Sequence, residues 1–252
     1  MKGIKGRNFI VVGGSNGIGK ATAIELMKRK GNVVIADLDE ANAMDVIRKN
    51  NKYTEKSYFY KTNITNMKDL VGLVNFVEKN MGHVHGLANI ASVNIFSTDT
   101  QNFNDWIQST QGSVAAYGIL TSLVVEKLMC LDGSVVNMSS ISSKIAQPNY
   151  GTYSAAKAAI SALSKCQALD FSEKKIRVNT VCPGTIWTKN NEKHLKMSRT
   201  EADESKDIGG KHILNRCGDP EEVADAIVFL LSNNSSFITG TEIIVDGGYT
   251  SL

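Results

Sequence analysis

Apolar residues along the chain fall into short runs that alternate with longer segments of helical period. The short runs are rich in Val and Ile and lack polar alternation, which is typical of strands buried on both faces of a sheet. They occupy residues 9–12, 32–36, 56–60, 86–88, 134–137, 177–181 and 242–245. Between them, apolar residues recur at helical spacing at residues 17–30, 40–49, 67–80, 103–129, 153–172 and 220–232. This alternation predicts an α/β fold in which one doubly wound parallel sheet carries helices on both faces.

One segment departs from this pattern. Residues 189–215 are polar, rich in Lys, Asn and Glu, and show no sustained apolar period. A stretch of this kind inside a compact domain is usually a functional lid or a mobile loop. We therefore expect a single domain over residues 1–252, in which 189–215 form a substrate loop that lies over the functional site.

Composition and charge narrow the class of protein. The 42% hydrophobic and 21% charged residues are ordinary for a globular chain and argue against a disordered one. The net charge of +3 is spread along the chain, and the basic run at residues 28–30 ends a predicted helix, where cations favour the dipole. A clustered basic face is absent from this sequence pattern, so we expect no nucleic-acid partner.

The sequence also bears on location and metal binding. It has no stretch near the ~20 apolar residues of a membrane helix and no signal-peptide pattern. Its four cysteines are far apart and indicate reduced, mostly buried thiols. His83 and His85 are two residues apart without further ligands of suitable spacing, so no metal site is expected. We expect a cytoplasmic protein with no membrane partner.

A glycine-rich turn stands between the first predicted strand and the first predicted helix. It reads Gly13-Gly14-Ser15-Asn16-Gly17-Ile18-Gly19. Glycines here permit close approach of the backbone to a pyrophosphate, and the helix N-terminus offers free N–H groups to phosphates. Glycine also serves ordinary turns and caps, but the strand–turn–helix context favours dinucleotide binding. The predicted fold is therefore Rossmann-like.

An acidic residue ends the second predicted strand. Asp37 lies close to the ~20-residue spacing at which an acid accepts hydrogen bonds from the ribose hydroxyls of a dinucleotide. A carboxylate there favours NAD, because it would repel the 2′-phosphate of NADP. The alternative is that Asp37 caps the helix that begins near Glu40.

Tyr153 and Lys157 are four residues apart and therefore share one face of a predicted helix. The pKa of a free phenol is ~10, and an adjacent ammonium lowers it. Tyr153 would then exchange a proton with an alcohol or a carbonyl, and Lys157 can also donate to the nicotinamide ribose. Ser140 follows a predicted strand at the edge where open α/β sheets bind ligands, and there it would bond the substrate oxygen. Taken singly, these residues also fit a solvated helix pair and a turn-forming serine.

Together the motifs resemble the short-chain dehydrogenase/reductase family over essentially the whole chain. The segments that carry the resemblance are Gly13-x-x-x-Gly17-Ile18-Gly19, Asn89-Ile90-Ala91-Ser92, Ser140 with Tyr153 and Lys157, Asn179-x-x-x-Pro183-Gly184, Gly218-x-Pro220 and Asp246-Gly247-Gly248. The resemblance implies catalysis by Ser140, Tyr153 and Lys157. It also implies a homo-oligomer, a tetramer or dimer, built on the helices at 103–129 and 153–172.

The motifs and the resemblance together indicate a set of cofactor-binding residues. The set is Gly13, Ser15, Asn16, Gly17, Ile18, Gly19, Asp37, Leu38, Asn63, Ile64, Asn89, Ala91, Tyr153, Lys157, Pro183, Gly184, Ile186 and Thr188. Within it, the resemblance implies that Ile186 and Thr188 face the nicotinamide amide.

The chain departs from the family pattern at several positions. Val12 replaces a usual Thr, and Asn63 stands where an Asp commonly contacts adenine, although an amide oxygen can accept the same bond. Ser92 alters the Asn-Asn-Ala-Gly segment beneath the cofactor. Ser113 stands where the family places an Asn that completes a proton relay through Lys157, so we expect a rearranged relay or reduced activity.

The sequence therefore predicts an NAD-dependent oxidoreductase that moves a hydride between nicotinamide and a secondary alcohol or ketone. One alternative is a 3-oxoacyl-chain ketoreductase, although such enzymes usually use NADP and Asp37 argues against it. A second alternative is a nucleotide-binding protein that has lost catalysis. It is suggested by Ser92 and Ser113, which depart from the family pattern.

Overall fold

The computed structural model describes residues 1–54, 56–96 and 101–252, which are built around one parallel sheet. Its seven strands, counted within the described residues, follow the order β3-β2-β1-β4-β5-β6-β7. They are β1 Asn8–Val12, β2 Asn32–Asp37, β3 Ser57–Lys61, β4 Val84–Asn89, β5 Met129–Met138, β6 Arg177–Pro183 and β7 Glu242–Val245. Because the strand order reverses at β1 and β4, the chain winds outward in both directions from the centre of the sheet, which is the Rossmann-like arrangement that the sequence predicts.

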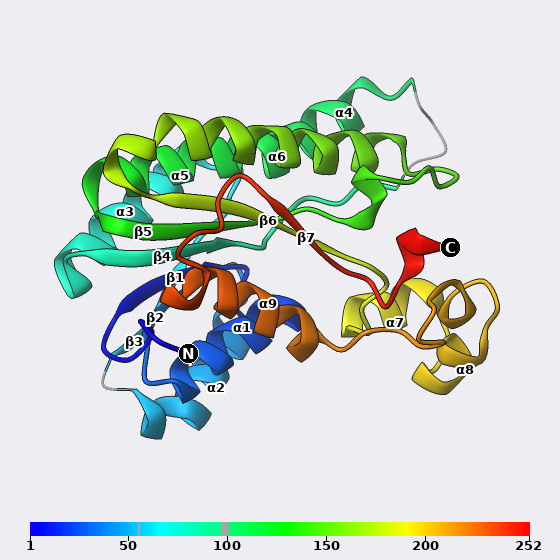
Figure 1. Ribbon diagram of the computed structural model, residues 1–252, viewed down its shortest axis with the longest axis horizontal. Coiled ribbons are helices and arrows are strands. Elements are labelled where there is room, and N and C mark those ends of the chain that lie inside the picture. The colour runs from blue at the N-terminus through cyan, green and yellow to red at the C-terminus, as the bar shows by residue number, and fades with distance from the viewer. Residues whose placement is uncertain (55, 97–100) are drawn as a thin grey trace.

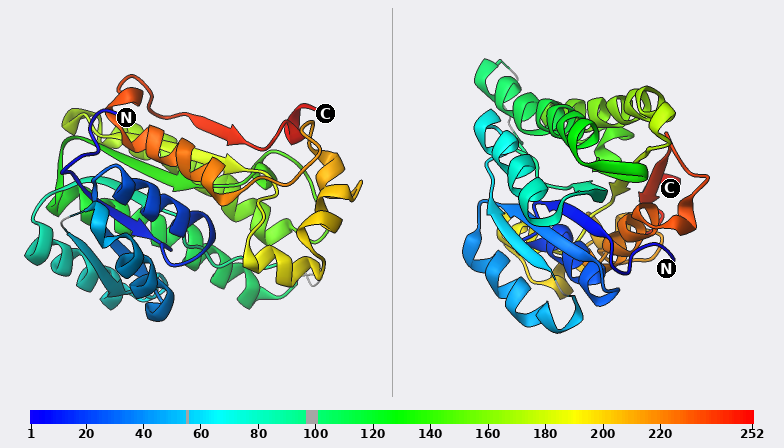
Figure 2. Two further views of the ribbon diagram at one scale, coloured as in Figure 1. Left: turned by 90° about the horizontal axis from the view of Figure 1, so that it is seen from below. Right: turned by 90° about the vertical axis from the view of Figure 1, so that its left-hand side faces the viewer.

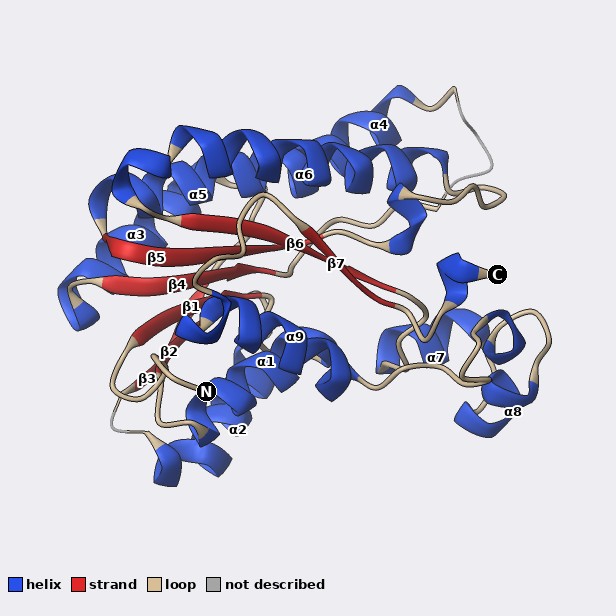
Figure 3. Cartoon of the chain, in the orientation of Figure 1, coloured by secondary structure: helices blue, strands red, loops and turns tan. Residues whose placement is uncertain are grey.

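Helices cover both faces of the sheet (Figures 1 and 2). They are α1 Gly17–Lys28, α2 Glu40–Asn50, α3 Met67–Met81, α4 Phe103–Thr110, α5 Ala116–Lys127, α6 Gly151–Asp170, α7 Lys189–Leu195, α8 Arg199–Glu204 and α9 Pro220–Leu231. In Figure 3 the red strands lie between α3, α5 and α6 on one side and α1, α2 and α9 on the other. The prediction of a doubly wound sheet is confirmed.

Strand β1 is apolar from Phe9 to Val12 because each face of the sheet meets its own helical layer. Phe9 and Val11 of β1 pack into the core that contains α1 and α9. Ile10 and Val12 point the opposite way, into the core formed with α3 and α5. Successive side chains of a strand alternate between faces, so a strand covered on both sides has no exposed position to fill with a polar residue.

The prediction of one continuous helix over residues 103–129 is wrong. A π-helical turn at Gln111–Ala115 separates α4 from α5, and β5 already begins at Met129. A π turn holds one extra residue in a turn and is common at functional sites. Here Gly112 admits the turn, since a Cβ atom on it would lie 2.2 Å from the Val93 side chain.

The polar segment 189–215 is also more ordered than its composition predicts. It forms α7, α8 and a 3₁₀ turn at Gly209–Lys211, beyond the carboxyl ends of the strands. In Figure 1 this group lies at the same end of the molecule as the C-terminus. Short helices without an apolar period need tertiary contacts to be stable, and these contacts belong to the site.

None of the helices in the described part of the chain combines the length and the apolar character that crossing a bilayer requires. The four cysteines, all of them described, are unpaired. Two of them, Cys182 and Cys217, are buried, whereas Cys166 is exposed, so the prediction of mostly buried thiols is only partly right.

Candidate active site

A cleft of about 620 Å³ opens at the carboxyl edge of the sheet, beside the N-terminus of α1. The glycine-rich turn forms one wall, the β4 loop forms the floor, and the starts of α7 and α9 form the opposite wall. Predicted residues that line it are Gly13, Asn16, Gly17, Ile18, Gly19, Asp37, Ala91 and Thr188. The cleft therefore joins segments from both ends of the chain.

The N-terminus of α1 faces this cleft without a side-chain cap among the described residues. The side chain of Asn16, the N-cap residue, instead donates to Asp39 and accepts from Asn42. No acidic residue lies in the first turn of α1. The first N–H groups and the positive end of the helix dipole are consequently available to an anion such as a pyrophosphate.

Two glycines of the turn have no room for a side chain. Gly13 has a φ of +85°, and a Cβ atom on it would lie 2.7 Å from the backbone nitrogen of Ala91. A Cβ atom on Gly19 would lie 1.9 Å from the carbonyl oxygen of Gly13. The turn thus packs directly on the β4 loop, which keeps its backbone close to whatever fills the cleft.

Asp37 is fixed at the end of β2 by backbone groups. Its carboxylate accepts hydrogen bonds from the N–H of Ser15 at 3.0 Å and from the N–H of Asp39 at 3.1 Å. The N-cap of α2 is Asp39, which accepts from the N–H of Asn42. The alternative in which Asp37 caps this helix is therefore wrong. The carboxylate instead holds the glycine turn and lines the cleft.

Tyr153 and Lys157 lie on α6, which packs beside the end of β5. The Nζ atom of Lys157 is 5.6 Å from the centre of the Tyr153 ring. The neighbouring serines have different partners. Ser139 donates to the carbonyl of Lys157 at 2.8 Å, whereas the hydroxyl of Ser140 bonds the phenol of Tyr153. The structure therefore brings Ser140, Tyr153 and Lys157 together.

Burial controls the acidity of both catalytic candidates. It raises the pKa of Tyr153 above its ordinary value, and the bond from Ser140 acts in the opposite direction. It lowers the pKa of Lys157 to about 8. The expectation that the neighbouring ammonium lowers the pKa of Tyr153 is therefore not met, because desolvation by burial is the largest influence on this phenol.

Lys157 connects this triad to the cleft. Its side chain is 1% exposed, and its Nζ atom donates to the hydroxyl of Ser92 at 3.2 Å and to the carbonyl of Met138 at 3.1 Å. Ser92 and Met138 both line the cleft. The amine therefore lies directly behind the cleft wall.

An aromatic wall stands next to Tyr153. The ring of Phe96 lies 4.9 Å from that of Tyr153 and 4.6 Å from that of Tyr150, measured between centroids. Tyr150 in turn meets Tyr153 edge-on at 5.8 Å. The three rings make the surroundings of the phenol mainly apolar.

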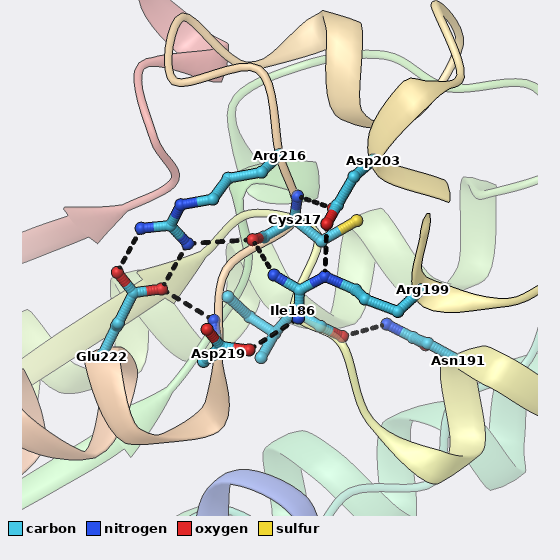
Figure 4. A network of polar contacts seen from close by, with 8 residues as sticks. All are labelled: Ile186, Asn191, Arg199, Asp203, Arg216, Cys217, Asp219 and Glu222. Atoms are coloured by element: carbon cyan, nitrogen blue, oxygen red, sulfur yellow. Dashed lines mark hydrogen bonds and ion pairs between the residues drawn. The ribbon is translucent and has the colours of Figure 1, made fainter. Parts of the chain in front are cut away.

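The polar segment 189–215 is joined to the start of α9 by a network of ion pairs (Figure 4). The guanidinium of Arg199 binds Asp203 and Asp219 and donates to the carbonyl of Cys217 at 2.9 Å. Arg216 binds Glu222, and this contact lowers the pKa of the Glu222 carboxyl to about 2. Polar residues hide the helical segments of 189–215 in the sequence, and polar contacts such as those of Arg199 order this segment in the structure.

Comparison with known proteins agrees with this geometry. A protein-family model described as enoyl-(acyl carrier protein) reductase matches residues 12–250. Cyclohexanol dehydrogenase from Acinetobacter sp. is 32% identical over 245 residues, which cover 96% of this chain and 94% of that protein. The chain belongs to the short-chain dehydrogenase/reductase family.

Two further proteins are similar over the full length. Cyclopentanol dehydrogenase from Comamonas testosteroni is 28% identical over 254 residues, covering 100% of both chains. A solved short-chain type dehydrogenase/reductase from Mycobacterium ulcerans has a TM-score of 0.88 with 24% identity, covering 100% of this chain and 92% of that one. This structure shares the fold of the short-chain dehydrogenase/reductase described here.

The remaining predicted residues do not line the cleft. Leu38 is exposed beyond β2, whereas Asn89 is buried and donates to Thr121 and Asn137. The others are Ser15, Asn63, Ile64, Pro183, Gly184 and Ile186. Among these, Asn63 accepts from Thr65, and Ile186 packs into the core below α9.

Ser92, which the sequence placed beneath the cofactor, lines the cleft. Other lining residues were not among the predicted site residues of this short-chain dehydrogenase/reductase: Lys20, Ala21, Ile24, Asn42, Ile90, Asn94, Met138, Trp187, Lys189, Glu192, Pro220 and Glu221. Pro220 offered a usable signal, because a proline in the first turn of a helix marks a helix start, and helix starts in this fold meet the ligand. The described residues contain no cluster that could hold a metal ion.

Proposed function

We propose that this chain is an NAD-dependent dehydrogenase of small secondary alcohols, acting reversibly on the corresponding ketones. The observation that supports this most is the position of Lys157. Its buried amine contacts Ser92 and Met138 of the cleft on one side and the Tyr153 ring on the other. A proton-transfer group and a dinucleotide cleft thus share one wall.

The residues of the cleft fit a nicotinamide dinucleotide. The glycine turn and the uncapped start of α1 suit the pyrophosphate, and Asp37 suits a ribose diol. When bound, the nicotinamide accepts or donates the hydride. The chain's own groups then handle the proton. During oxidation Ser140 binds the substrate oxygen, the Tyr153 phenolate takes its proton, and Lys157 keeps a positive charge near that phenolate.

The proposed substrate class is a small alcohol on an apolar ring. Phe96, Tyr150 and Tyr153 form an apolar surface at the reacting hydroxyl, which favours a hydrocarbon body over a charged one. The cyclohexanol and cyclopentanol dehydrogenases among the relatives are consistent with this class. A 3-oxoacyl-chain ketoreductase remains the alternative, and NADPH-dependent reduction of an acyl thioester without oxidation of cyclic alcohols would favour it.

Tyr153→Phe tests the catalytic assignment. We expect it to lower kcat for cyclohexanol oxidation by about 10²–10⁴-fold, because the proton acceptor is lost, while NADH still binds. Tyr58→Phe is the matched control, since Tyr58 lies on β3 and packs against Phe76. Full turnover by Tyr153→Phe would refute the assignment. Wild-type protein that binds NADH but turns over no alcohol or ketone would favour a decayed nucleotide-binding protein.

Asp37→Asn tests the choice of NAD. The wild type should bind NADH more tightly than NADPH, and the variant should reduce this preference by about tenfold, equivalent to ~1.4 kcal/mol, because the amide cannot repel a 2′-phosphate. Titration of both nucleotides by fluorescence measures the effect. Asp45→Asn is the control, since that carboxylate pairs with Arg48 and Lys49 on α2. A wild type that prefers NADPH would overturn the proposal.

We further propose one domain over residues 1–252 with 189–215 as its lid, a cytoplasmic location and a homo-oligomer. The unpaired cysteines, Cys166 among them exposed, suit a reducing compartment. Leu169 of α6 and Ile119 of α5 are exposed apolar residues on the helices that the family resemblance points to. Sedimentation analysis of the purified protein and cell fractionation test these two statements.

A further inference from the structure

The buried amine of Lys157 has a hydrogen-bonded route to the cleft that differs from the one expected from the family resemblance. Lys157 is 1% exposed, Ser92 is half-buried and Asn94 is exposed. The amine donates to the hydroxyl of Ser92 at 3.2 Å, and that hydroxyl donates to the amide oxygen of Asn94 at 2.7 Å. The three residues therefore lead in order from the protein interior to the cleft.

Ser113, at the position of the expected relay residue, faces elsewhere. Its hydroxyl donates to the carbonyl of Val93 at 3.4 Å, and the N–H of Val93 donates to the carbonyl of Gly112 at 3.1 Å. The π-helical turn is thus hydrogen-bonded to the backbone of Val93, between Ser92 and Asn94. Through this contact Ser113 positions the Ser92–Asn94 segment. Among the described residues it makes no hydrogen bond with Lys157.

We propose that Ser92 is the proton exit of this enzyme, carrying protons between Lys157 and water in the cleft. This inference rests on the proposed dehydrogenase function. During alcohol oxidation the substrate's hydride leaves to the nicotinamide, and its hydroxyl proton goes to the phenolate form of Tyr153, which becomes the neutral phenol. The Lys157 ammonium passes one proton to the Ser92 oxygen while Ser92 releases its own proton to a water molecule, and the Tyr153 proton then restores the ammonium. Asn94 orients the Ser92 hydroxyl outward.

The surroundings of Lys157 support an outlet at Ser92. The titratable groups that act on its amine are Tyr153 and Cys182, among the residues the structure describes. Neither group is a carboxylate, and burial raises the pKa of both. The other acceptor of the amine is the carbonyl of Met138, which has no proton to release. A hydroxyl can accept one proton and donate another. Of the two groups that accept hydrogen bonds from Lys157, only Ser92 has a hydroxyl.

Proton exchange of the Lys157 ammonium measures the exit without substrate or cofactor. In protein labelled with 15N-lysine, the Lys157 signal is assigned by its loss in Lys157→Arg, and its exchange with water is followed by NMR. We expect Ser92→Ala to slow this exchange several-fold and Ser92→Thr, which keeps the hydroxyl, to restore it. Exchange in Ser92→Ala that equals or exceeds the wild-type rate overturns the proposal.

Turnover provides the second measurement. Ser92→Ala should lower kcat for alcohol oxidation several-fold and enlarge its solvent deuterium isotope effect, with KM for the alcohol unchanged, and Ser92→Thr should reverse both changes. NADH binding and the thermal unfolding midpoint verify that each variant is folded. A larger isotope effect in Ser113→Ala than in Ser92→Ala assigns the exit to Ser113 and overturns the proposal. Because the exchange experiment needs no catalysis, its failure is separable from failure of the dehydrogenase function.

Discussion

The buried side chain of Lys157 carries a functional group where packing alone favours an apolar one. Its hydrogen bonds are to Ser92 and to the carbonyl of Met138, and burial lowers its pKa to about 8. Removing an ammonium from water without a neighbouring carboxylate is unfavourable. Such destabilised groups are typical of active sites, where activity and stability conflict.

We expect Lys157→Met to stabilise the protein without ligand while abolishing turnover. The gain should be about 2 kcal/mol near pH 7, measured by urea unfolding. The folded-state pKa lies below the unfolded value of 10.5, so the wild type binds fewer protons when folded and gains stability as pH rises from about 8 to 10.5. The advantage of the variant should therefore shrink over that range.

Lys79→Met is the control for that comparison, because Lys79 is exposed on α3. It should change stability little at any pH. If Lys157→Met proves less stable than the wild type at pH 7, the hydrogen bonds of the amine outweigh its desolvation.

At the level of single residues, the sequence indicated which residues carry functional groups better than it indicated which residues they contact. The glycine turn, Asp37 and the Tyr153–Lys157 pair were all recognisable, since backbone conformation and helical spacing restrict which residues fit. The sequence could not show that Ser92 bonds Lys157, or that Asn89 bonds Thr121 and Asn137 inside the core. These contacts join residues far apart in the chain, and neither residue has a local pattern that reveals its partner.

Between elements, a carboxylate joins the edge strand to the catalytic helix. Glu242 of β7 accepts from Ser161 of α6 and pairs with Lys144 and Lys165. Burial alone would raise its pKa, but these partners together lower it to about 2. The folded-state pKa thus lies below the unfolded value of 4.5. The resulting stabilisation is present above about pH 4.5 and disappears as pH falls toward 2.

Glu242→Gln should therefore destabilise the protein by about 2 kcal/mol at pH 7, with the difference from wild type vanishing in acid. Denaturant unfolding at several pH values measures this. Glu221→Gln is not a suitable control because Glu221 lines the cleft, whereas Glu78→Gln on the exposed face of α3 is suitable. A pH-independent loss would mean that shape, rather than charge, holds β7 to α6.

The elements differ in how far their sequences predicted them. Strands β1 and β2 and helices α1 and α9 were found within a few residues, because the strands are continuous apolar runs and the helices bury apolar residues at helical spacing. The break at Gln111–Ala115 was missed, since a π turn preserves apolar composition and shifts only the register. Helices α7 and α8 were missed because polar contacts, rather than an apolar stripe, fix them. Asn191 of α7 donates to the carbonyl of Ile186, and Arg199 of α8 pairs with Asp219.

At the scale of the whole molecule, the Arg199 network couples the segment 189–215 to the cleft. Arg199 of α8 binds Asp219, the N-cap of α9, and the next residue, Pro220, already lines the cleft. The same guanidinium donates to the carbonyl of Cys217. A loss of this contact therefore reaches both the substrate side and the dinucleotide side.

We expect Arg199→Ala to raise KM for the alcohol and weaken NADH binding several-fold, with a smaller effect on kcat, because the walls move while the proton-transfer groups remain. Arg48→Ala is the matched control. That guanidinium pairs with Asp45 within α2, remote from the lid. Steady-state kinetics and NADH titration measure both variants. Unchanged constants in Arg199→Ala would show that the lid keeps its position without this ion-pair network.

The cleft collects its walls from the first glycine turn, the middle of the chain and α9, so no short piece of the chain contains it. Only a completely folded molecule can hold the dinucleotide, and binding to the folded state alone shifts the folding equilibrium in its favour. The lifetime of the protein against proteases is consequently tied to the supply of nicotinamide dinucleotide. In a cell depleted of that pool, the enzyme would be lost by degradation as well as left idle.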